Sequence, residues 1–239
     1  MVAAIGVESI SYVCVLGGPL KILAIDTATA RGSVALVADG QIEGEVRLRA
    51  PEGHSRHLLG AVAFLLESLG WAPSQVEGFA VCAGPGSFTG LRVGLSTVQG
   101  LALASGRPCL GLPTLDVLAQ RIRGAAPTLV ALMDAFRGEV FGRLYDREAR
   151  PLGQAHSEAP DAFLSRVEGE AAFIGDGVVK YRACVQARHP QALQPERELY
   201  LAGTLGRMAE ARFAAGLGVA PERLRPIYLR EAQIRKSER

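Results

Sequence analysis

The sequence predicts an α/β protein built from two duplicated domains. Two observations carry this prediction. A strand pair with an aspartate at its tip occurs twice, about a hundred residues apart, and a short apolar strand in the first half leads through a glycine-rich turn into a long helix. The chain has 239 residues, 49% of them hydrophobic and 21% charged. This composition is typical of a globular protein with one large or two small domains.

The repeated unit is a predicted hairpin with an acidic tip. The first copy has these parts in order: residues 22–26, which end in Asp26, then Arg31-Gly32, then residues 33–37. The second copy has the same parts in the same order: residues 129–133, Asp134, Arg137-Gly138 and residues 140–145. The match favours a duplication, although a single pairwise match of this quality also arises by chance.

Two predicted helices in the first half carry very few charges. The first spans 55–69, with Glu67 as its only charge after Arg56, and the second spans 89–105, with Arg92 as its only charge. A helix on a sheet needs one apolar stripe, whereas a helix that is apolar on most sides must be covered twice. We therefore expect a protein–protein interface here; the alternative is that the other half of the chain buries both helices. The residues expected to contact a partner are Leu58, Leu59, Val62, Leu65, Leu66, Leu91, Leu95 and Val98.

A glycine-rich loop precedes the second helix. It follows the short apolar strand at 79–83 and reads Gly-Pro-Gly-Ser-Phe-Thr-Gly over 84–90. A helix N-terminus offers free N–H donors, and glycine lets a ligand or another backbone come close. The spacing matches neither the dinucleotide motif nor the P-loop, and Ser87 lacks the flanking glycines of a nucleophile elbow, so Ser87 or Thr89 is expected to cap the helix. The residues assigned to this loop and helix start are Gly84, Gly86, Ser87, Thr89, Gly90 and Arg92.

Charge and residue usage exclude several functional classes. The formal net charge of +2 provides no broad basic surface, so stand-alone nucleic-acid binding is not expected. The four cysteines form no C-x-x-C pair, which fits a cytoplasmic protein with reduced thiols. His54 and His57 have a metal-ligand spacing but no third ligand nearby, so helix capping or exposure is expected. No apolar run reaches the roughly 20 residues that a membrane-spanning helix needs, and residues 1–20 do not resemble a secretory signal.

The eleven-residue stretch at 84–94 resembles the signature of the TsaB (YeaZ) family, bacterial proteins needed to make threonylcarbamoyladenosine in tRNA. Four further segments are similar to other parts of the same family: residues 22–27, His54-Ser55, residues 133–140 and residues 226–230. The resemblance therefore covers about 21–230 and leaves residues 1–20 as an extension without a counterpart.

The resemblance implies an actin-like ATPase-superfamily fold, related to ribonuclease H, with two duplicated α/β domains and a degenerate nucleotide cleft. It implies a non-catalytic scaffold or activator that binds no cofactor and dimerises with the catalytic paralogue TsaD through helices of the N-terminal domain. It also implies the ATPase TsaE as a partner, a homodimer as a further state, and tRNA as a partner only through the complex. The expected parts are an extension at 1–20, an N-terminal domain at 21–112, a C-terminal domain at 113–230 and a basic tail at 231–239. The tail is either a solvated terminus or a contact with tRNA inside the complex.

Two features separate the chain from the catalytic paralogue. Residues 111–118 lack the His-x-x-x-His motif of TsaD-like proteins, and Asp116 among apolar neighbours cannot hold a metal ion by itself. The second hairpin tip places Phe136 and Glu139 where phosphate oxygens would lie in an actin-like cleft, and like charge there costs roughly 1 to 4 kcal/mol. The nucleotide-loop positions that we regard as degenerate are Asp26, Thr27, Asp134 and Gly138.

Two alternatives to a scaffold follow from the same residues. An actin-fold ATPase or small-molecule kinase would use Asp26 and Asp134 around a magnesium nucleotide. A peptidase would need a metal triad or a Ser/His pair, and the sequence shows neither at a usable spacing.

Overall fold

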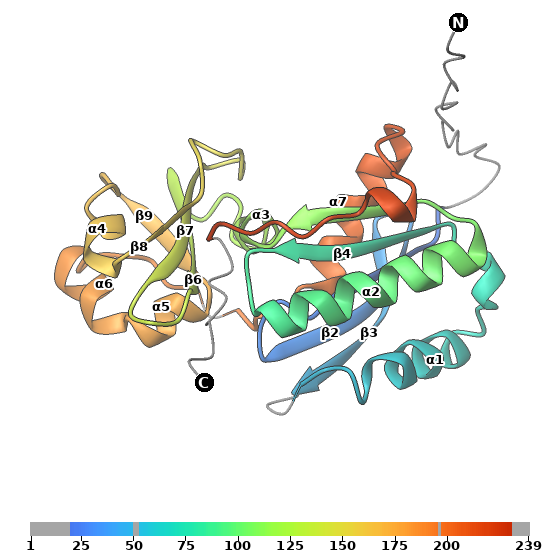
Figure 1. The fold of residues 1–239 in the computed structure, drawn as a ribbon. Coiled ribbons are helices and arrows are strands. Elements are labelled where there is room, and N and C mark those ends of the chain that lie inside the picture. The colour runs from blue at the N-terminus through green and yellow to red at the C-terminus, as the bar shows by residue number, and fades with distance from the viewer. Residues whose placement is uncertain (1–19, 50–52, 196, 231–239) are drawn as a thin grey trace, which may run out of the picture.

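The computed structural model describes residues 20–49, 53–195 and 197–230, which form two lobes with one β-sheet each (Figure 1). The expected extension at 1–20 lies, except for Leu20, outside the described residues, and so does the expected basic tail. Within the described ranges, no helix combines the length and the apolar character needed to cross a membrane.

The first lobe contains a five-stranded sheet in the order β3-β2-β1-β4-β5. Its strands are β1 (Ile22–Asp26), β2 (Arg31–Ala38), β3 (Gln41–Arg49), β4 (Gly78–Gly84) and β5 (Cys109–Pro113). The first three form an antiparallel meander, and β4 and β5 extend the sheet in parallel to β1. β1 and β4 are buried along their whole length because helices cover both faces of the sheet.

Helices lie on both faces of the first sheet. α1 (Leu58–Ser68) contacts β2 and β3, and α2 (Phe88–Ser105) contacts β4 and β5, whereas α7 (Ala202–Ala214) packs on the opposite face of β1 and β2 (Figure 1). Both predicted helices of the first half are thus confirmed. Glycine permits the close approach of α7, since a Cβ at Gly206 would overlap Val37. Two 3-10 turns lie at Pro73–Gln75 and Pro221–Arg223.

The second lobe contains a four-stranded sheet in the order β8-β7-β6-β9. Its strands are β6 (Thr128–Asp134), β7 (Val140–Asp146), β8 (His156–Glu158) and β9 (Ala171–Ile174). Its helices are α4 (Pro160–Leu164), α5 (Asp176–Lys180) and α6 (Arg182–Arg188). They contribute to a core around Phe163 and Phe173. α3 (Thr114–Gln120) contacts β4, β6 and α7, and it therefore joins the two lobes.

The structure confirms the predicted duplication. In each lobe an antiparallel hairpin has a first strand that ends in an aspartate, β1 with β2 and β6 with β7. In each lobe that first strand also pairs in parallel with a later strand, β4 beside β1 and β9 beside β6. The two carboxylates take the same local role, because Asp26 Oδ1 accepts the Ala28 amide and Asp134 Oδ1 accepts the Phe136 amide.

The chain returns to the first lobe after α6. α7 packs on β1 and β2, Val219 forms a β-bridge with Cys109, and the Ile227 amide donates to the Ala83 carbonyl. The expected C-terminal domain at 113–230 is therefore divided, because only its first part surrounds the second sheet. We correct the expected boundary accordingly: α7 and the segment after it supply the apolar cover that the second face of the first sheet needs.

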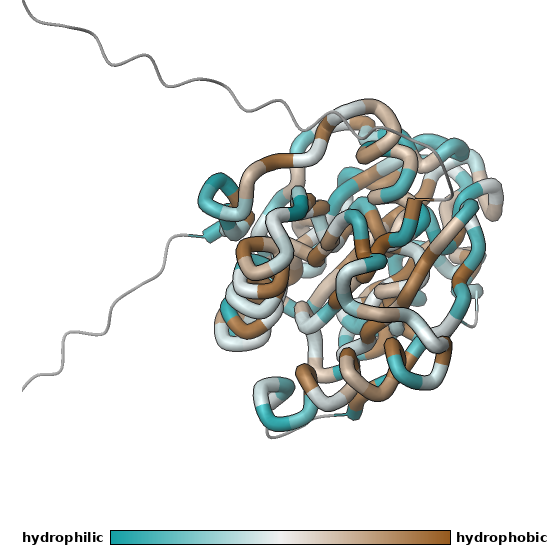
Figure 2. The backbone as a smooth tube through the Cα atoms, turned by 90° about the vertical axis from the view of Figure 1, so that its right-hand side faces the viewer, coloured by the Kyte–Doolittle hydropathy of each residue, from teal (hydrophilic) through white to brown (hydrophobic). Residues whose placement is uncertain are grey.

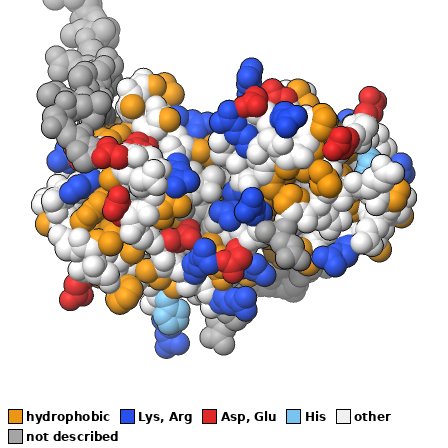
Figure 3. All heavy atoms as spheres, turned by 180° about the vertical axis from the view of Figure 1, so that it is seen from behind, with side chains coloured by type: hydrophobic (Ala, Val, Ile, Leu, Met, Phe, Trp, Pro, Cys, Tyr) orange, Lys and Arg blue, Asp and Glu red, His pale blue; other side chains and the backbone are white. Residues whose placement is uncertain are grey.

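One continuous apolar core runs through both lobes and includes residues of β1, β4, α2 and β6. Hydrophobic segments lie mainly in the interior and hydrophilic segments mainly at the outer turns (Figure 2). The face shown in Figure 3 carries basic and acidic side chains interspersed with each other, in keeping with the formal net charge of +2.

Candidate functional site

At the first hairpin tip, the polar side chains are buried and make contacts within the protein. Asp26 is 0% exposed, and burial is the main cause that raises its pKa from 3.8 to about 6. Its Oδ1 accepts the Ala28 amide at 3.0 Å, the Cys82 thiol lies beside the carboxyl group, and Oδ2 accepts no hydrogen bond of ordinary geometry within the described residues. His54 is buried at the same tip, with Nε2 2.7 Å from the Thr29 carbonyl oxygen. Asp26 therefore lies in the core.

The glycine-rich loop packs directly on this tip. The Thr27 hydroxyl donates to the Gly90 carbonyl at 2.7 Å, and a Cβ at Gly90 would overlap the Thr27 carbonyl oxygen. Gly86 comes equally close to Ala28, so these two glycines allow contact between two backbone segments. Ser87 Oγ accepts the Gly90 amide at 3.3 Å, which confirms the predicted N-cap of the helix.

The remaining loop residues lie at the surface or under the C-terminal segment. Thr89 is exposed at the first turn of α2, and the Arg92 guanidinium stacks over the Phe88 ring at 3.8 Å. Gly84 has a φ of +126°, and a Cβ there would overlap the Ile227 carbonyl oxygen. Arg92 therefore belongs to an aromatic surface, and Gly84 supports the return of the chain.

The second hairpin tip is open and is held by polar contacts. Lys180 Nζ donates to Asp134 Oδ2 at 2.8 Å, and the Asp134 amide donates to Asp176 Oδ1 at 3.1 Å. Burial raises the pKa of Asp176. Phe136 and Arg137 both have positive φ, +59° and +54°, which is uncommon for residues other than glycine. This backbone leaves the Phe136 side chain 59% exposed.

Gly138 and Glu139 complete this turn. Gly138 continues it with a φ of +83°, and Glu139 Oε2 lies 3.3 Å from Arg230 Nη1 and accepts the Ser157 hydroxyl. Two residues, Phe136 and Glu139, were expected to obstruct phosphate oxygens. Phe136 lines the cleft that lies between the two hairpin tips, and Glu139 is not part of its lining. The expectation for Glu139 is corrected, because its carboxylate contacts Arg230 and Ser157 instead.

A cleft of about 570 Å³ lies between the two hairpin tips, a volume in the range of small-molecule sites. Its lining includes Thr29, His54, Ser87, Thr89, Asp134, Phe136 and Asp176. The two aspartates that an ATPase or kinase would need do not meet there, because Asp134 lines the cleft and Asp26 is buried beneath it. Within the described ranges, no three His, Cys, Asp or Glu side chains are grouped so that they could hold a metal ion.

The outer faces of α1 and α2 differ from the predicted interface. Seven of the eight predicted contact residues are buried against the sheet or the rest of the lobe: Leu58, Val62, Leu65, Leu66, Leu91, Leu95 and Val98. The expectation that these seven contact a partner is corrected, because they form the apolar stripe that each helix needs for its own sheet. Leu59 alone is exposed, at 60%. The sequence analysis missed two exposed residues of the same faces, Phe64 at 62% and Leu103 at 65%.

The chain matches the family profile described as "TsaD: tRNA N6-adenosine threonylcarbamoyltransferase" over residues 42–212. It is also 35% identical over 228 residues to the "tRNA threonylcarbamoyladenosine biosynthesis protein TsaB" of Escherichia coli (strain K12), with 88% of this chain and 95% of that relative covered. The chain belongs to the TsaB family. This result confirms the resemblance inferred from the loop at 84–94.

Solved structures agree with membership of the TsaB family. The chain is similar to YeaZ from Pseudomonas aeruginosa with a TM-score of 0.75 and 33% identity, over 87% of this chain and 99% of that one. Component A of the (R)-2-hydroxyglutaryl-CoA dehydratase of Acidaminococcus fermentans has a TM-score of 0.53 at 10% identity, and this likeness concerns the fold alone. The expected two-lobed actin-like fold is confirmed.

The acidic residue of the segment 111–118 is Asp116, in the first turn of α3. Residues 111–118 contain no histidine, and Asp116 is engaged within the protein. Its Oδ1 accepts hydrogen bonds from Arg143 at 3.1 Å and from the Tyr145 hydroxyl at 2.8 Å. Asp116 therefore ties α3 to the second sheet.

Proposed function

We propose that the chain is the non-catalytic subunit of a complex that makes threonylcarbamoyladenosine in tRNA, and that it activates a TsaD-like paralogue by pairing with it through α1 and α2. Membership of the TsaB family supports a role in the synthesis of threonylcarbamoyladenosine, and the surface of the first lobe supports pairing through α1 and α2. In this proposal a TsaE-like ATPase joins the pair, tRNA is modified by the complex, and a homodimer uses the same surface when the paralogue is absent.

One observation carries the proposal: α1 and α2 present an apolar and small-residue outer face on the same side of the first sheet. We name this the outer helix face, and its exposed members are Leu59, Gly60, Ala63, Phe64, Gly100, Leu103 and Ala104. Large apolar side chains exposed together mark interaction surfaces, and glycine and alanine between them let another helix approach closely. Within the two helices, Glu67 and Arg92 are the only charged residues, so few charges would be desolvated on pairing.

The state of the two hairpin acids supports a role without bond-making chemistry. Asp26 is buried against Cys82 and Ala28, and Asp134 is engaged by Lys180. A magnesium nucleotide between the lobes would need both carboxylates at the cleft surface, and only Asp134 lies there.

The test mixes the purified chain with a TsaD-like protein of the same source and measures the complex by size-exclusion chromatography with light scattering. We expect Leu59→Glu and Phe64→Glu each to weaken the complex at least about tenfold, because each places a charge in an apolar contact. The matched control is Leu152→Glu, an equally exposed apolar residue of the second lobe, which should leave the complex intact. Equal binding by all three variants would place the contact elsewhere.

A second measurement tests activation itself. Reconstituted tRNA modification with the TsaD-like and TsaE-like proteins should depend on this chain and should fall with Leu59→Glu but not with Leu152→Glu. Turnover that is unchanged when this chain is omitted would refute the proposed role.

A further inference from the structure

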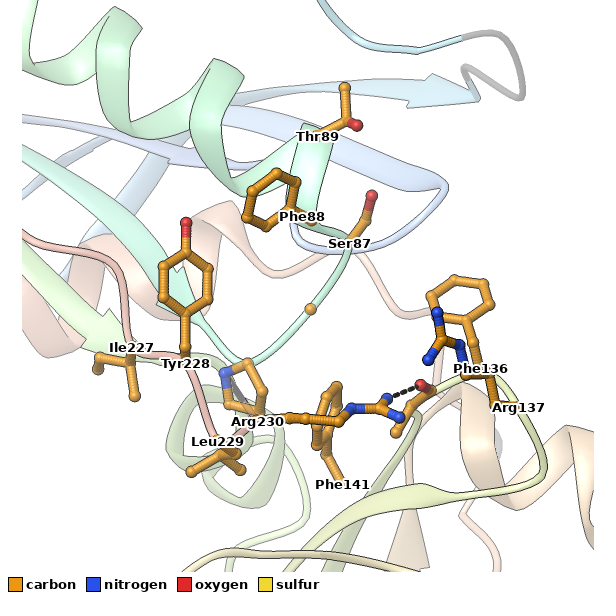
Figure 4. Close-up of a pocket in the computed structure, with 13 residues that line it drawn as sticks. Ser87, Phe88, Thr89, Phe136, Arg137, Phe141, Ile227, Tyr228, Leu229 and Arg230 are labelled. Carbon is orange, nitrogen blue, oxygen red and sulfur yellow. Dashed lines mark hydrogen bonds between the residues drawn. The ribbon is translucent and has the colours of Figure 1, made fainter. Parts of the chain in front are cut away.

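A second cavity adjoins the cleft and is lined by aromatic rings from three distant parts of the chain (Figure 4). It has a volume of about 500 Å³. Phe88 comes from the start of α2, Phe136 from the turn between β6 and β7, and Tyr228 from the C-terminal segment that returns to the first lobe. All three side chains are exposed. We call this cavity the aromatic pocket.

The rings stand on opposite sides of the aromatic pocket. The Phe88 and Tyr228 centroids are 5.7 Å apart with an interplanar angle of 32°, so these two rings form one aromatic wall. Figure 4 shows Phe136 on the other side of the cavity, beside Arg137. The pocket therefore offers ring faces from two sides to anything that enters it.

Phe136 is held in this position at a cost. Its φ of +59°, followed by +54° at Arg137, is a conformation that bulky L-residues rarely adopt. The turn is held by three hydrogen bonds: the Phe136 amide donates to Asp134 Oδ1, the Glu139 amide to the Phe136 carbonyl, and the Ala135 amide to the Glu139 carbonyl. The turn therefore holds a large apolar ring at the surface in a conformation that is unusual for its residue type, and such residues cluster at ligand sites.

The charged groups around the aromatic pocket are mainly basic. Arg137 and Arg230 line it, and Arg92 stacks on Phe88 at its edge. Arg230 is fixed in place by a hydrogen bond to the Ala135 carbonyl and by an ion pair with Glu139. Aromatic faces together with guanidinium groups suit a ligand that has both a flat ring and a negative charge.

We propose that the aromatic pocket binds one unstacked nucleotide, with the base between Phe136 and the Phe88–Tyr228 wall and the phosphate toward the arginines. The volume fits a ligand of this size. The nucleotide comes either from a free mononucleotide or from an unpaired position of an RNA strand, and the two sources share the same chemistry. The pocket uses different residues from those of the outer helix face, so this proposal stands or falls independently of the pairing proposed above.

The test uses the full chain and two probes at low ionic strength. AMP is titrated by calorimetry, and a fluorescein-labelled single-stranded octa-adenylate RNA is titrated by fluorescence anisotropy. We expect Phe136→Ala and Tyr228→Ala each to weaken binding by about 5- to 150-fold, the range measured for one base stacked on one aromatic ring. The matched control is Leu152→Ala, an equally exposed apolar residue of the second lobe outside both proposed surfaces, which should bind as the unaltered chain does.

Two further variants separate stacking from folding and from apolar packing. Phe136→Gly relieves the positive φ, so it should keep or raise the melting temperature while it loses binding. Phe136→Leu keeps an apolar side chain without an aromatic face, and it should lose binding as well. Binding of AMP alone would identify a free nucleotide as the ligand, and binding of the RNA alone or more tightly would identify an RNA strand. No binding of either probe would overturn the proposal, and full binding by Phe136→Leu would overturn the stacking of the base on Phe136.

Discussion

The two hairpin tips share one hydrogen bond and differ in the surroundings of their aspartates. Each ends its first strand in an aspartate whose Oδ1 accepts the amide two residues further on. Asp26 is then buried beside the Cys82 thiol, whereas Asp134 is bound by Lys180 near the surface. The comparison teaches that the duplication has preserved a hydrogen bond, whereas the backbone of the turn and the environment of the carboxylate differ between the lobes.

The segments that follow the parallel strands extend the same contrast. Gly84, the last residue of β4, and Gly175, the residue that follows β9, have nearly the same φ, +126° and +124°. After Gly84 the chain forms α2, a helix of 18 residues, whereas after Gly175 it forms α5, a helix of five residues. The first lobe therefore has a long helix that can present an outer face, and the second lobe has none in this position among the described residues.

The largest expected effect tests whether the second lobe requires glycine at position 175. Gly175→Ala should lower the free energy of unfolding by about 3 kcal/mol or more, because the new Cβ would overlap the Leu132 carbonyl oxygen and the φ is unfavourable. The control is Gly169→Ala, which has a positive φ but open space around it, and should cost about 1 kcal/mol. Denaturant unfolding measures both, and equal losses would show that the backbone contact does not constrain the second lobe.

The next effect concerns the two aspartates. The pKa of Asp26 rises from 3.8 to about 6 on folding because burial disfavours its charged form, so its contribution to stability is fully present below about pH 4 and is lost as the pH rises through about 6. The difference in unfolding free energy between the unaltered chain and Asp26→Asn should therefore fall by about 3 kcal/mol between about pH 4 and pH 8.

Asp134→Asn is the control for this pH dependence, since it leaves the buried carboxylate in place. It should keep the part of the pH dependence that Asp26 provides, and Asp176, whose pKa burial also raises, should leave part of the dependence in Asp26→Asn. Chemical denaturation across the pH range is the measurement. If Asp26→Asn followed the unaltered chain at every pH, the carboxyl group would titrate as a solvated acid.

The smallest effect concerns the cap that α2 has and α5 lacks. Ser87→Ala should destabilise the protein by about 0.5 to 1 kcal/mol, because the Gly90 amide loses its acceptor. The control is Ser96→Ala on the exposed side of the same helix, which should be neutral or slightly stabilising since alanine favours the helix. Thermal unfolding resolves the two, and a neutral Ser87→Ala would mean that solvent replaces the cap.

Much of the fold could be predicted because its signals are local. The apolar runs that end in Asp26 and Asp134 predicted both hairpins, and the glycine-rich loop predicted the start of α2 and its Ser87 cap. The division of the lobes could not be predicted, because nothing local in α7 indicates which sheet it will cover. The return of the chain to the first lobe is a long-range contact, and such contacts leave no periodic pattern in the sequence.

The candidate surfaces were predicted less well than the fold. Charge-poor helices indicated an interface, but composition alone does not distinguish the stripe that faces the sheet from the stripe that faces outward, so Leu59 was found and Phe64 and Leu103 were missed. The aromatic pocket was out of reach for a different reason. Phe88, Phe136 and Tyr228 are far apart in the sequence, and only the folded chain brings them to one cavity.

The return of α7 and residues 219–229 to the first sheet has a consequence for how the molecule is made. The second lobe emerges from the ribosome complete while one face of the first sheet, including Ala24 and Val37, still lacks the helix that buries it. The lobe that is begun first during synthesis is therefore finished last. A chain interrupted after α6 would leave that apolar face exposed, and exposed apolar surface of this kind makes an incomplete chain prone to aggregate.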